Sequence, residues 1–166
     1  METLQRTANR GSVSTGYDVA NSCKFEKDNS ERLQRSDSNI GTPTNADKFT
    51  FSIWIKRTEL QSSGEDIFFC GNAGAVSTIF GFQNDVLKFR TNSGDTEIKT
   101  NRVFRDTAAF YHIVVAYDST DSTEADRVKF YVNGVEETSL GTANYPSLNA
   151  DSEMYETNMS HFVGSP

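Results

Sequence analysis

Carboxylates and histidines are the side chains of this sequence that could carry acid–base chemistry. Two carboxyl groups at alternate positions of one strand share a face, which suits a nucleophile and a general acid. The acidic pairs instead fall in expected turns and loops, or on opposite faces after a turn: Glu65-Asp66, Glu124 with Asp126, and Glu136-Glu137. His112 and His161 lie in expected strands, where a histidine is more often structural than catalytic. The sequence therefore predicts no enzyme.

Trp54 is a candidate for binding rather than catalysis, because an exposed indole can stack on a sugar ring. In the stretch FTFSIWIKR it lies on the face opposite the phenylalanines, with Ser52 and Lys56 as polar neighbours. These three residues form a candidate glycan site. The alternative is that a loop or another strand covers Trp54, because large aromatic residues of β-sandwiches usually belong to the core.

Three aspartates could hold a metal ion. Asp118, Asp121 and Asp126 lie in or next to the polar stretch STDSTEAD, and hard oxygen ligands on flexible loops suit calcium. The alternative is that these aspartates are ordinary loop residues, since Asp, Ser and Thr are common there.

Composition limits the remaining function classes. The chain has 166 residues, of which 36% are hydrophobic, enough for one domain with a sizeable core. The formal net charge of −7 argues against nucleic acid as a partner, because phosphate binding depends on Lys and Arg. No apolar run approaches the roughly 20 residues that cross a bilayer, and the N-terminus lacks the apolar segment of a secretion signal. We therefore expect no membrane insertion.

The chain contains two cysteines, Cys23 and Cys70. Neither belongs to a CxxC or Cys/His cluster, so the spacing indicates neither zinc nor a redox pair. Each lies in an apolar run, which predicts two buried thiols; a disulfide between them is the alternative.

Short apolar runs separated by turn residues predict strands along most of the chain. Alternation is strongest from Phe49 to Ile55, while residues 110–118 are apolar on both faces, as is typical of a central strand covered on both sides. Asn84-Asp85 and Asn133-Gly134 predict tight hairpin turns. The other predicted strands are residues 22–25, 31–34, 67–71, 77–83, 86–91, 96–101, 128–132 and 161–163.

Evenly spaced strands with turn residues between them predict an all-β fold, an antiparallel sandwich or jelly roll. One helical turn is expected at residues 103–109, with Asp106 as its cap. Residues 1–16 are polar and almost free of apolar side chains, which predicts an extended N-terminal arm that contacts another molecule. Residues 17–166 form the predicted domain.

The sequence resembles the laminin-G-like, or concanavalin A-like, jelly roll over about residues 21–164. The likeness lies in the order and spacing of six segments: FTFSIWIKR, IFF, FGFQNDVLKF, VFRDTAAFYHIVVAYDST, RVKFYVNGVEE, and NYPSLNADSEM with HFVG. It is similar in particular to the version found in structural proteins of tailed bacteriophages of marine bacteria. The resemblance implies a virion structural protein, in a tail fibre or appendage or as a capsid decoration, that contributes to assembly and host attachment. The alternative is a non-catalytic carbohydrate-binding adhesin domain of a cell-surface protein.

The resemblance also implies partners, a location and an open sheet edge. The expected partners are other virion proteins, further copies of the chain and a host-surface glycan; the expected location is the virion, assembled in the host cytoplasm. Some laminin-G-like domains bind calcium, whereas glucanases of this fold carry a Glu-x-Asp-x-x-Glu series that this sequence lacks. Such domains usually continue past HFVG into a closing strand. Without it, we expect an open edge beside residues 22–25 that another chain can fill.

Overall fold

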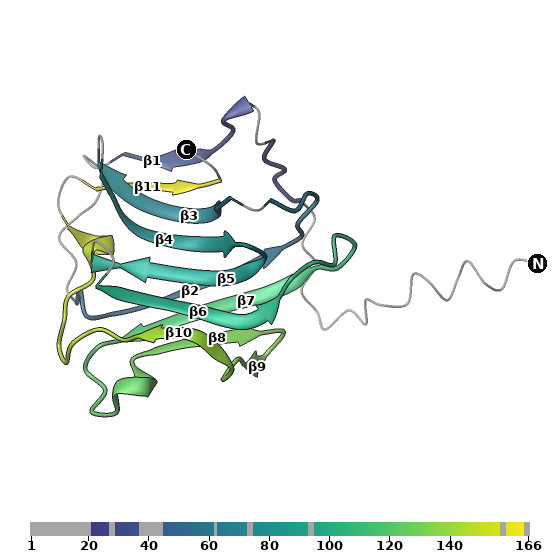
Figure 1. Cartoon of the computed structure of the whole chain (residues 1–166). Helices are drawn as coiled ribbons and strands as arrows, with labels where there is room; N and C mark the ends of the chain where they lie inside the picture. Colours follow the sequence, from purple (N-terminus) through teal and green to yellow (C-terminus); the bar gives the residue numbers. More distant parts are fainter. Residues whose placement is uncertain are drawn as a thin grey trace, which may run out of the picture.

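The protein is built almost entirely of β-strands arranged in two stacked sheets (Figure 1). The computed structural model describes residues 21–26, 29–36, 45–61, 63–72, 75–92, 95–156 and 159–164. The predicted arm, residues 1–16, and its boundary with the domain lie outside these residues. Within them, no helix is long and apolar enough to span a membrane. The prediction of an all-β antiparallel sandwich is confirmed.

Eleven strands and two short 3₁₀ turns make up the regular structure of the described residues. The strands are β1 (Leu33–Arg35), β2 (Lys48–Ile55), β3 (Glu65–Asn72), β4 (Ala75–Gln83), β5 (Val86–Thr91), β6 (Thr96–Val103), β7 (Tyr111–Asp118), β8 (Val128–Val132), β9 (Val135–Glu136), β10 (Leu140–Asn144) and β11 (Ser160–Val163). The 3₁₀ turns are η4 (Glu124–Asp126) and η5 (Glu153–Tyr155).

All strand pairs are antiparallel. The larger sheet has the order β1-β11-β3-β4-β5-β6-β10, and the smaller sheet has the order β2-β7-β8-β9. In the small sheet, β2 pairs over eight residues with β7, which is far from it in sequence, whereas β7, β8 and β9 are consecutive. Figure 1 shows the small sheet behind the large one, so that each sheet has one inner and one outer face.

The inner faces meet in an aromatic core. Alternation along β2 turns Phe49 and Phe51 inward, where Phe49 stacks on Tyr117 of β7 with ring centroids 5.0 Å apart. Phe51 lies against Phe68 and Phe80 of the large sheet, with centroids 5.1 and 5.3 Å away. Burial of such large side chains, at about 1.5–3 kcal/mol each, is the main stabilising contribution to the sandwich.

Two hairpin turns form where the sequence predicts them. Asn84 and Asp85 join β4 to β5 with φ of 51° and 65°, and Asn133 and Gly134 join β8 to β9 with φ of 53° and 80°. Positive φ at both central residues matches the twist of paired strands and favours Asn, Asp and Gly. The turn chemistry therefore sets the register of both hairpins.

Gly81 is required by a close approach of two strands. The register between β3 and β4 shifts between Asp66 and Phe68, which brings the backbone of β3 over Gly81. A Cβ atom at this position would collide with the carbonyl oxygen of Glu65. Glycine is therefore the residue that fits beneath this bulge.

A buried arginine links four parts of the sandwich. Arg57 is 4% exposed and follows β2 on the inward-facing series of that strand. Its guanidinium donates to Glu65 of β3 at 2.8 Å, to Asp85 of the β4–β5 turn at 2.9 Å, and to the carbonyl of Phe104. We call these four residues the Arg57 clamp. The guanidinium also lies 4.4 Å from the ring centroid of Phe82.

One part of the core is closed by irregular chain rather than by a strand. Met154, in η5, and Met159 are both buried beside β3 and β11. The Nε2 atom of His161 donates to the carbonyl of Met154 at 2.7 Å, and the Sγ atom of Cys70 lies 3.8 Å from the same oxygen. This segment therefore caps the inner side of β3 and β11.

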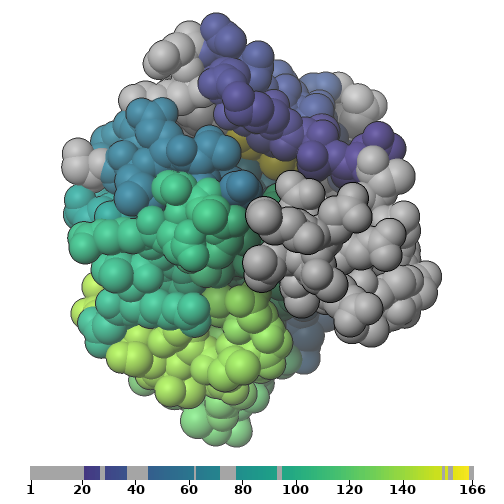
Figure 2. All heavy atoms as spheres, turned by 90° about the vertical axis from the view of Figure 1, so that its right-hand side faces the viewer, coloured from purple at the N-terminus to yellow at the C-terminus, as the bar shows by residue number. Residues whose placement is uncertain are grey.

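The two ends of the described chain lie together. In the space-filling view, the purple segment before β1 lies over part of the yellow C-terminal segment (Figure 2). A Cβ atom at Gly164 would contact Phe25, and β1 pairs with β11. Residues 22–25, however, form no strand, so the open edge expected beside them is not there. The edge strands are β1 and β10 in the large sheet and β2 and β9 in the small one.

Three further predictions differ from the structure. The strand β7 is central, but its outer face is only half-buried, because no layer of strands covers it. Residues 103–109 contain the end of β6 and a turn instead of a helical turn, although Asp106 does accept the Ala108 N–H as a cap would. Cys23 is exposed, whereas Cys70 is buried as expected, and both thiols are free.

Candidate functional site

The outer face of the small sheet carries an exposed cluster of aromatic side chains. Antiparallel pairing places Trp54 of β2 directly opposite His112 of β7, and Phe110 lies just before β7. Trp54 is 64% exposed and Phe110 is 60% exposed. We call these three residues the aromatic platform. Because exposed aromatic rings rarely cluster on a protein surface without a role, this cluster is the candidate recognition site.

Trp54 is held in place by His112. The two rings are stacked, with centroids 5.0 Å apart and an angle of 26° between their planes. The Nε2 atom of His112 lies 2.9 Å from the hydroxyl of Ser52, which fixes the imidazole from the side of β2. Stacking is worth about 0.5–1.5 kcal/mol and leaves the outer face of the indole free to meet a ligand.

The β8–β9 turn holds His112 from the other side. The His112 N–H donates to Oδ1 of Asn133 at 2.9 Å, and the Asn133 N–H donates to the His112 carbonyl at 2.8 Å. The two residues of the turn therefore reach the platform. Trp54, Phe110, His112, Asn133 and Gly134 together line a shallow hollow of about 460 Å³.

Lys56 places a positive charge beside the platform. Its Nζ atom lies 5.6 Å from the centroid of the Phe110 ring, within range of a cation–π interaction. The hollow itself is lined by aromatic, amide and glycine groups without a carboxylate. Its aromatic, imidazole and amide groups can stack on a ligand and form hydrogen bonds with it.

The three residues of the predicted glycan site lie close to one another. Trp54 is exposed, so no loop or strand of the described residues covers it. Ser52 supports His112, and Lys56 lies over Phe110. The sequence did not reveal the other members of the site, because Trp54 and His112 are 58 residues apart and become neighbours only when β2 pairs with β7. The Asn-Gly turn was visible, but its closeness to the platform was not.

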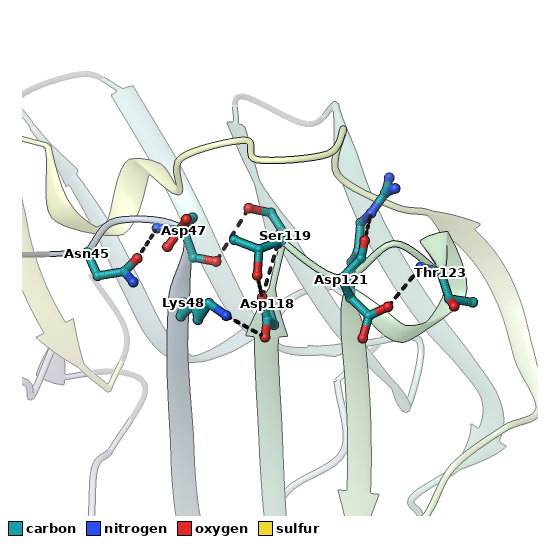
Figure 3. Close-up of polar contacts among 9 residues, drawn as sticks. Asn45, Asp47, Lys48, Asp118, Ser119, Asp121 and Thr123 are labelled. Atoms are coloured by element: carbon teal, nitrogen blue, oxygen red, sulfur yellow. Dashed lines mark hydrogen bonds and ion pairs between the residues drawn. The ribbon is translucent and has the colours of Figure 1, made fainter.

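Figure 3 shows Asp118 and Asp121, two of the three predicted calcium ligands, each bonded to a different neighbour. Asp118 accepts hydrogen bonds from the Thr120 hydroxyl and backbone and pairs with Lys48 at 3.1 Å. Asp121 accepts the Thr123 N–H at 2.8 Å. Among the described residues no group of three or more His, Cys, Asp or Glu side chains is arranged to hold a metal ion.

Asp126 likewise has a partner within the protein, Lys129, at 2.8 Å. The hydrogen bond that Lys129 donates to Asp126 raises the pKa of Lys129, and the bonds that Thr120 and Lys48 donate lower the pKa of Asp118. The charged form of Asp118 is therefore stabilised by its own neighbours.

The acids of β3 have different surroundings. Glu65 belongs to the Arg57 clamp, while burial raises the pKa of Asp66. Asp66 lies opposite Gly81 in the large sheet, whereas the platform belongs to the small sheet. Neither acid is therefore placed to act on a ligand at the platform.

Comparisons with known proteins agree with this architecture. A laminin-G-type family model described as the concanavalin A-like lectin/glucanases superfamily matches residues 27–159. A search of curated proteins gives no match.

Two solved structures are similar to the chain. One is described as "Cellulose induced protein, Cip1", with 16% identity, a TM-score of 0.45, and coverage of 76% of this chain and 62% of that one. The other is the binding domain of Paraclostridial Mosquitocidal Protein 1, with 14% identity, a TM-score of 0.43, and coverage of 81% and 39%. The chain thus spans less than two thirds of the length of either.

Proposed function

The chain belongs to the concanavalin A-like lectin/glucanases superfamily, and on this premise we propose that it is a non-catalytic carbohydrate-binding domain of a tailed-bacteriophage virion. It binds a glycan of the host surface on the aromatic platform. The assignment to a virion rests on the resemblance of the sequence to phage structural proteins. The assignment to carbohydrate binding rests on the family and on the site.

One observation carries the binding proposal: the outer face of Trp54 is open while its inner face is held by His112. An indole fixed in this way presents a flat apolar surface with little loss of side-chain entropy when a ligand binds. The apolar face of a pyranose ring matches this surface, and its hydroxyl groups can meet the amide of Asn133 at the edge of the hollow.

Binding without hydrolysis is the proposal because of the chemistry of the hollow. Glycoside hydrolysis uses two carboxyl groups on either side of the scissile bond, about 5–10 Å apart. The residues that line the hollow offer two aromatic rings, an imidazole, an amide and a glycine.

A glycan array tests the proposal with three proteins: the parent, Trp54→Ala and Leu148→Ala. Leu148 is the control because it is also an exposed apolar residue, at 53%, and is not part of the platform. We expect specific binding by the parent and by the Leu148 variant, and at least a tenfold loss in the Trp54 variant. Silence of the parent on bacterial surface glycans, or equal binding by all three, would refute the proposal.

A second candidate function, assembly with copies of the chain or other virion proteins, is favoured by the edge strand β2. It is eight residues long and pairs without a register shift, whereas β1 and β9 have three and two residues and the pairing of β10 contains a shift. Long regular edges readily pair with another strand, and short or irregular ones do so less. Its inward residues, such as Phe51 and Ile53, are only partly buried.

Sedimentation velocity tests this second function. If β2 pairs with a copy of itself, Thr50→Lys places a repelling charge at the exposed centre of the edge and should shift oligomers to monomers. Ala143→Lys on the edge strand β10 is the matched control and should leave the distribution unchanged. A monomeric parent at high concentration would exclude self-assembly through β2.

A further inference from the structure

The β8–β9 turn places a hydrogen-bond donor beside the platform. Asn133 lines the hollow, and its Oδ1 atom already accepts the N–H of His112 at 2.9 Å. This bond fixes which way the amide faces, because only the oxygen can accept. The Nδ2 atom, which can donate two hydrogen bonds, has no protein acceptor among the described residues.

The turn also keeps this donor in a fixed position. Asn133 has a φ of 53°, a conformation that few residue types other than Asn, Asp and Gly adopt at low cost. Its backbone N–H bonds the His112 carbonyl at 2.8 Å, so main chain and side chain are both anchored to β7. Beside it, a Cβ atom on Gly134 would meet nothing within 4 Å, so a ligand can approach the turn closely.

The second aromatic ring defines what else the ligand must carry. Trp54 and Phe110 are both more than half exposed, and both line the hollow. One pyranose ring that stacks on Trp54 leaves Phe110 without an apolar partner. A substituent with a methyl group next to a strong acceptor would satisfy Phe110 and the Nδ2 donor of Asn133 together.

The acetamido group of an N-acetylhexosamine has these two features. Its carbonyl oxygen is a strong acceptor, its methyl group is apolar, and it is attached at the rim of the sugar ring. Resting on the proposed function, we infer that the platform selects glycans with N-acetylhexosamine units, and that Asn133 is the specificity-determining residue. A sugar with a hydroxyl at that position loses the contact with Phe110 and offers a weaker acceptor.

Chitotetraose and cellotetraose test the inference, because they share one backbone and differ in having an acetamido or a hydroxyl group at C2. Trp54 is the only tryptophan of the chain, so its fluorescence reports binding at the platform directly. We expect the parent to bind chitotetraose at least tenfold more tightly than cellotetraose. Equal affinities for the two oligosaccharides, both dependent on Trp54, would overturn the inference and leave the proposed function standing. If the parent binds neither oligosaccharide, the inference is overturned, and the glycan array decides the proposed function separately.

Asn133→Asp tests the donor itself. Aspartate tolerates the turn and keeps an oxygen for the His112 N–H, but it replaces the Nδ2 donor with an acceptor. We expect at least a tenfold weaker affinity for chitotetraose, a smaller loss of affinity for cellotetraose, and no change in the emission of free Trp54. Asn84→Asp is the matched control, because Asn84 has a φ of 51° in the other hairpin turn. An unchanged affinity for chitotetraose in Asn133→Asp would overturn the role of this residue.

Discussion

Removal of the buried guanidinium of Arg57 should destabilise the sandwich strongly. In Arg57→Ala, two carboxylates and one main-chain carbonyl lose a donor, and the ring of Phe82 loses a cation. A hydrogen bond to a charged group contributes about 1.5–3 kcal/mol when one partner is removed. The loss of two such bonds should lower the free energy of unfolding by about 3–6 kcal/mol if the surrounding structure does not relax.

We expect the lower end of this range, because Glu65 and Asp85 still have hydrogen-bond partners after Arg57 is removed. The Glu65 side chain is 24% exposed and can bind water, and Asp85 keeps its bond to Arg105 at 2.8 Å. We therefore expect a loss of about 3 kcal/mol, as for other broken buried ion pairs. For a domain of this size the melting temperature should fall by about 6–12 °C.

Urea unfolding followed by circular dichroism measures this loss, with Arg105→Ala as the control. Arg105 binds the same carboxylate as Arg57, but its side chain is 66% exposed. Its removal should shift the urea midpoint no more than an ordinary surface substitution does. Equal midpoints for the two variants, or a shift below 1 °C for Arg57→Ala, would refute the claim that burial gives the clamp its stability.

Acid should reduce the difference between the parent and Arg57→Ala. Hydrogen bonds from Arg105 and Arg57 lower the pKa of Asp85 in the folded protein. The stability from this carboxylate is therefore present above the ordinary aspartate pKa, about 3.9, and is lost as the pH falls through the folded pKa. The difference in urea midpoint should accordingly be full at pH 7 and shrink below pH 4. A difference that is constant from pH 7 to pH 3 would contradict this account.

Three further substitutions or reactions test other parts of the structure. Gly81→Ala pushes a methyl group into the backbone of β3 and should cost about 1–3 kcal/mol in urea unfolding, while an unchanged midpoint would deny the close approach. Asn133→Ala keeps the backbone bond to His112 but forces alanine to a φ of 53°, so the melting temperature should fall and the Trp54 emission should change as well. A change in only one of these two measurements would show that the turn does not support the platform. Iodoacetamide at pH 8 should label Cys23 but not Cys70 in the native protein, because burial raises the pKa of Cys70 to about 12; rapid labelling of both would contradict the packing.

Local chemistry made much of the fold predictable. The alternation from Phe49 to Ile55 and the two pairs of turn residues each specify a conformation within a few residues of chain. The strands β2 and β5 and both hairpins accordingly lie where the sequence predicts them. The boundaries of β3 extend further than predicted, because pairing with β4 adds the polar end residues Glu65, Asp66 and Asn72, which carry no apolar signal.

Contacts between distant segments limited the prediction of the candidate site. Trp54 was a candidate from its place on the polar face of a strand, but His112 and Phe110 join it only through the pairing of β2 with β7. Arg57 was missed although a signal was present, because it occupies the next inward position after Ile55 in the same alternating series. A charged residue at an inward position is thus a useful sign of a buried ion pair.

The irregular segment around η5, which covers the inner side of β3 and β11, should open more easily than the strands of the small sheet. Strands β2, β7 and β8, which carry the platform, are held by continuous ladders, whereas Met154 and Met159 lie outside every strand ladder of the described residues. Brief detachment of this loop would wet the inner side of β3 while the small sheet stays intact. Amide exchange with heavy water would then be faster around residues 152–156 than in β7, and the face that carries the platform would remain ordered throughout.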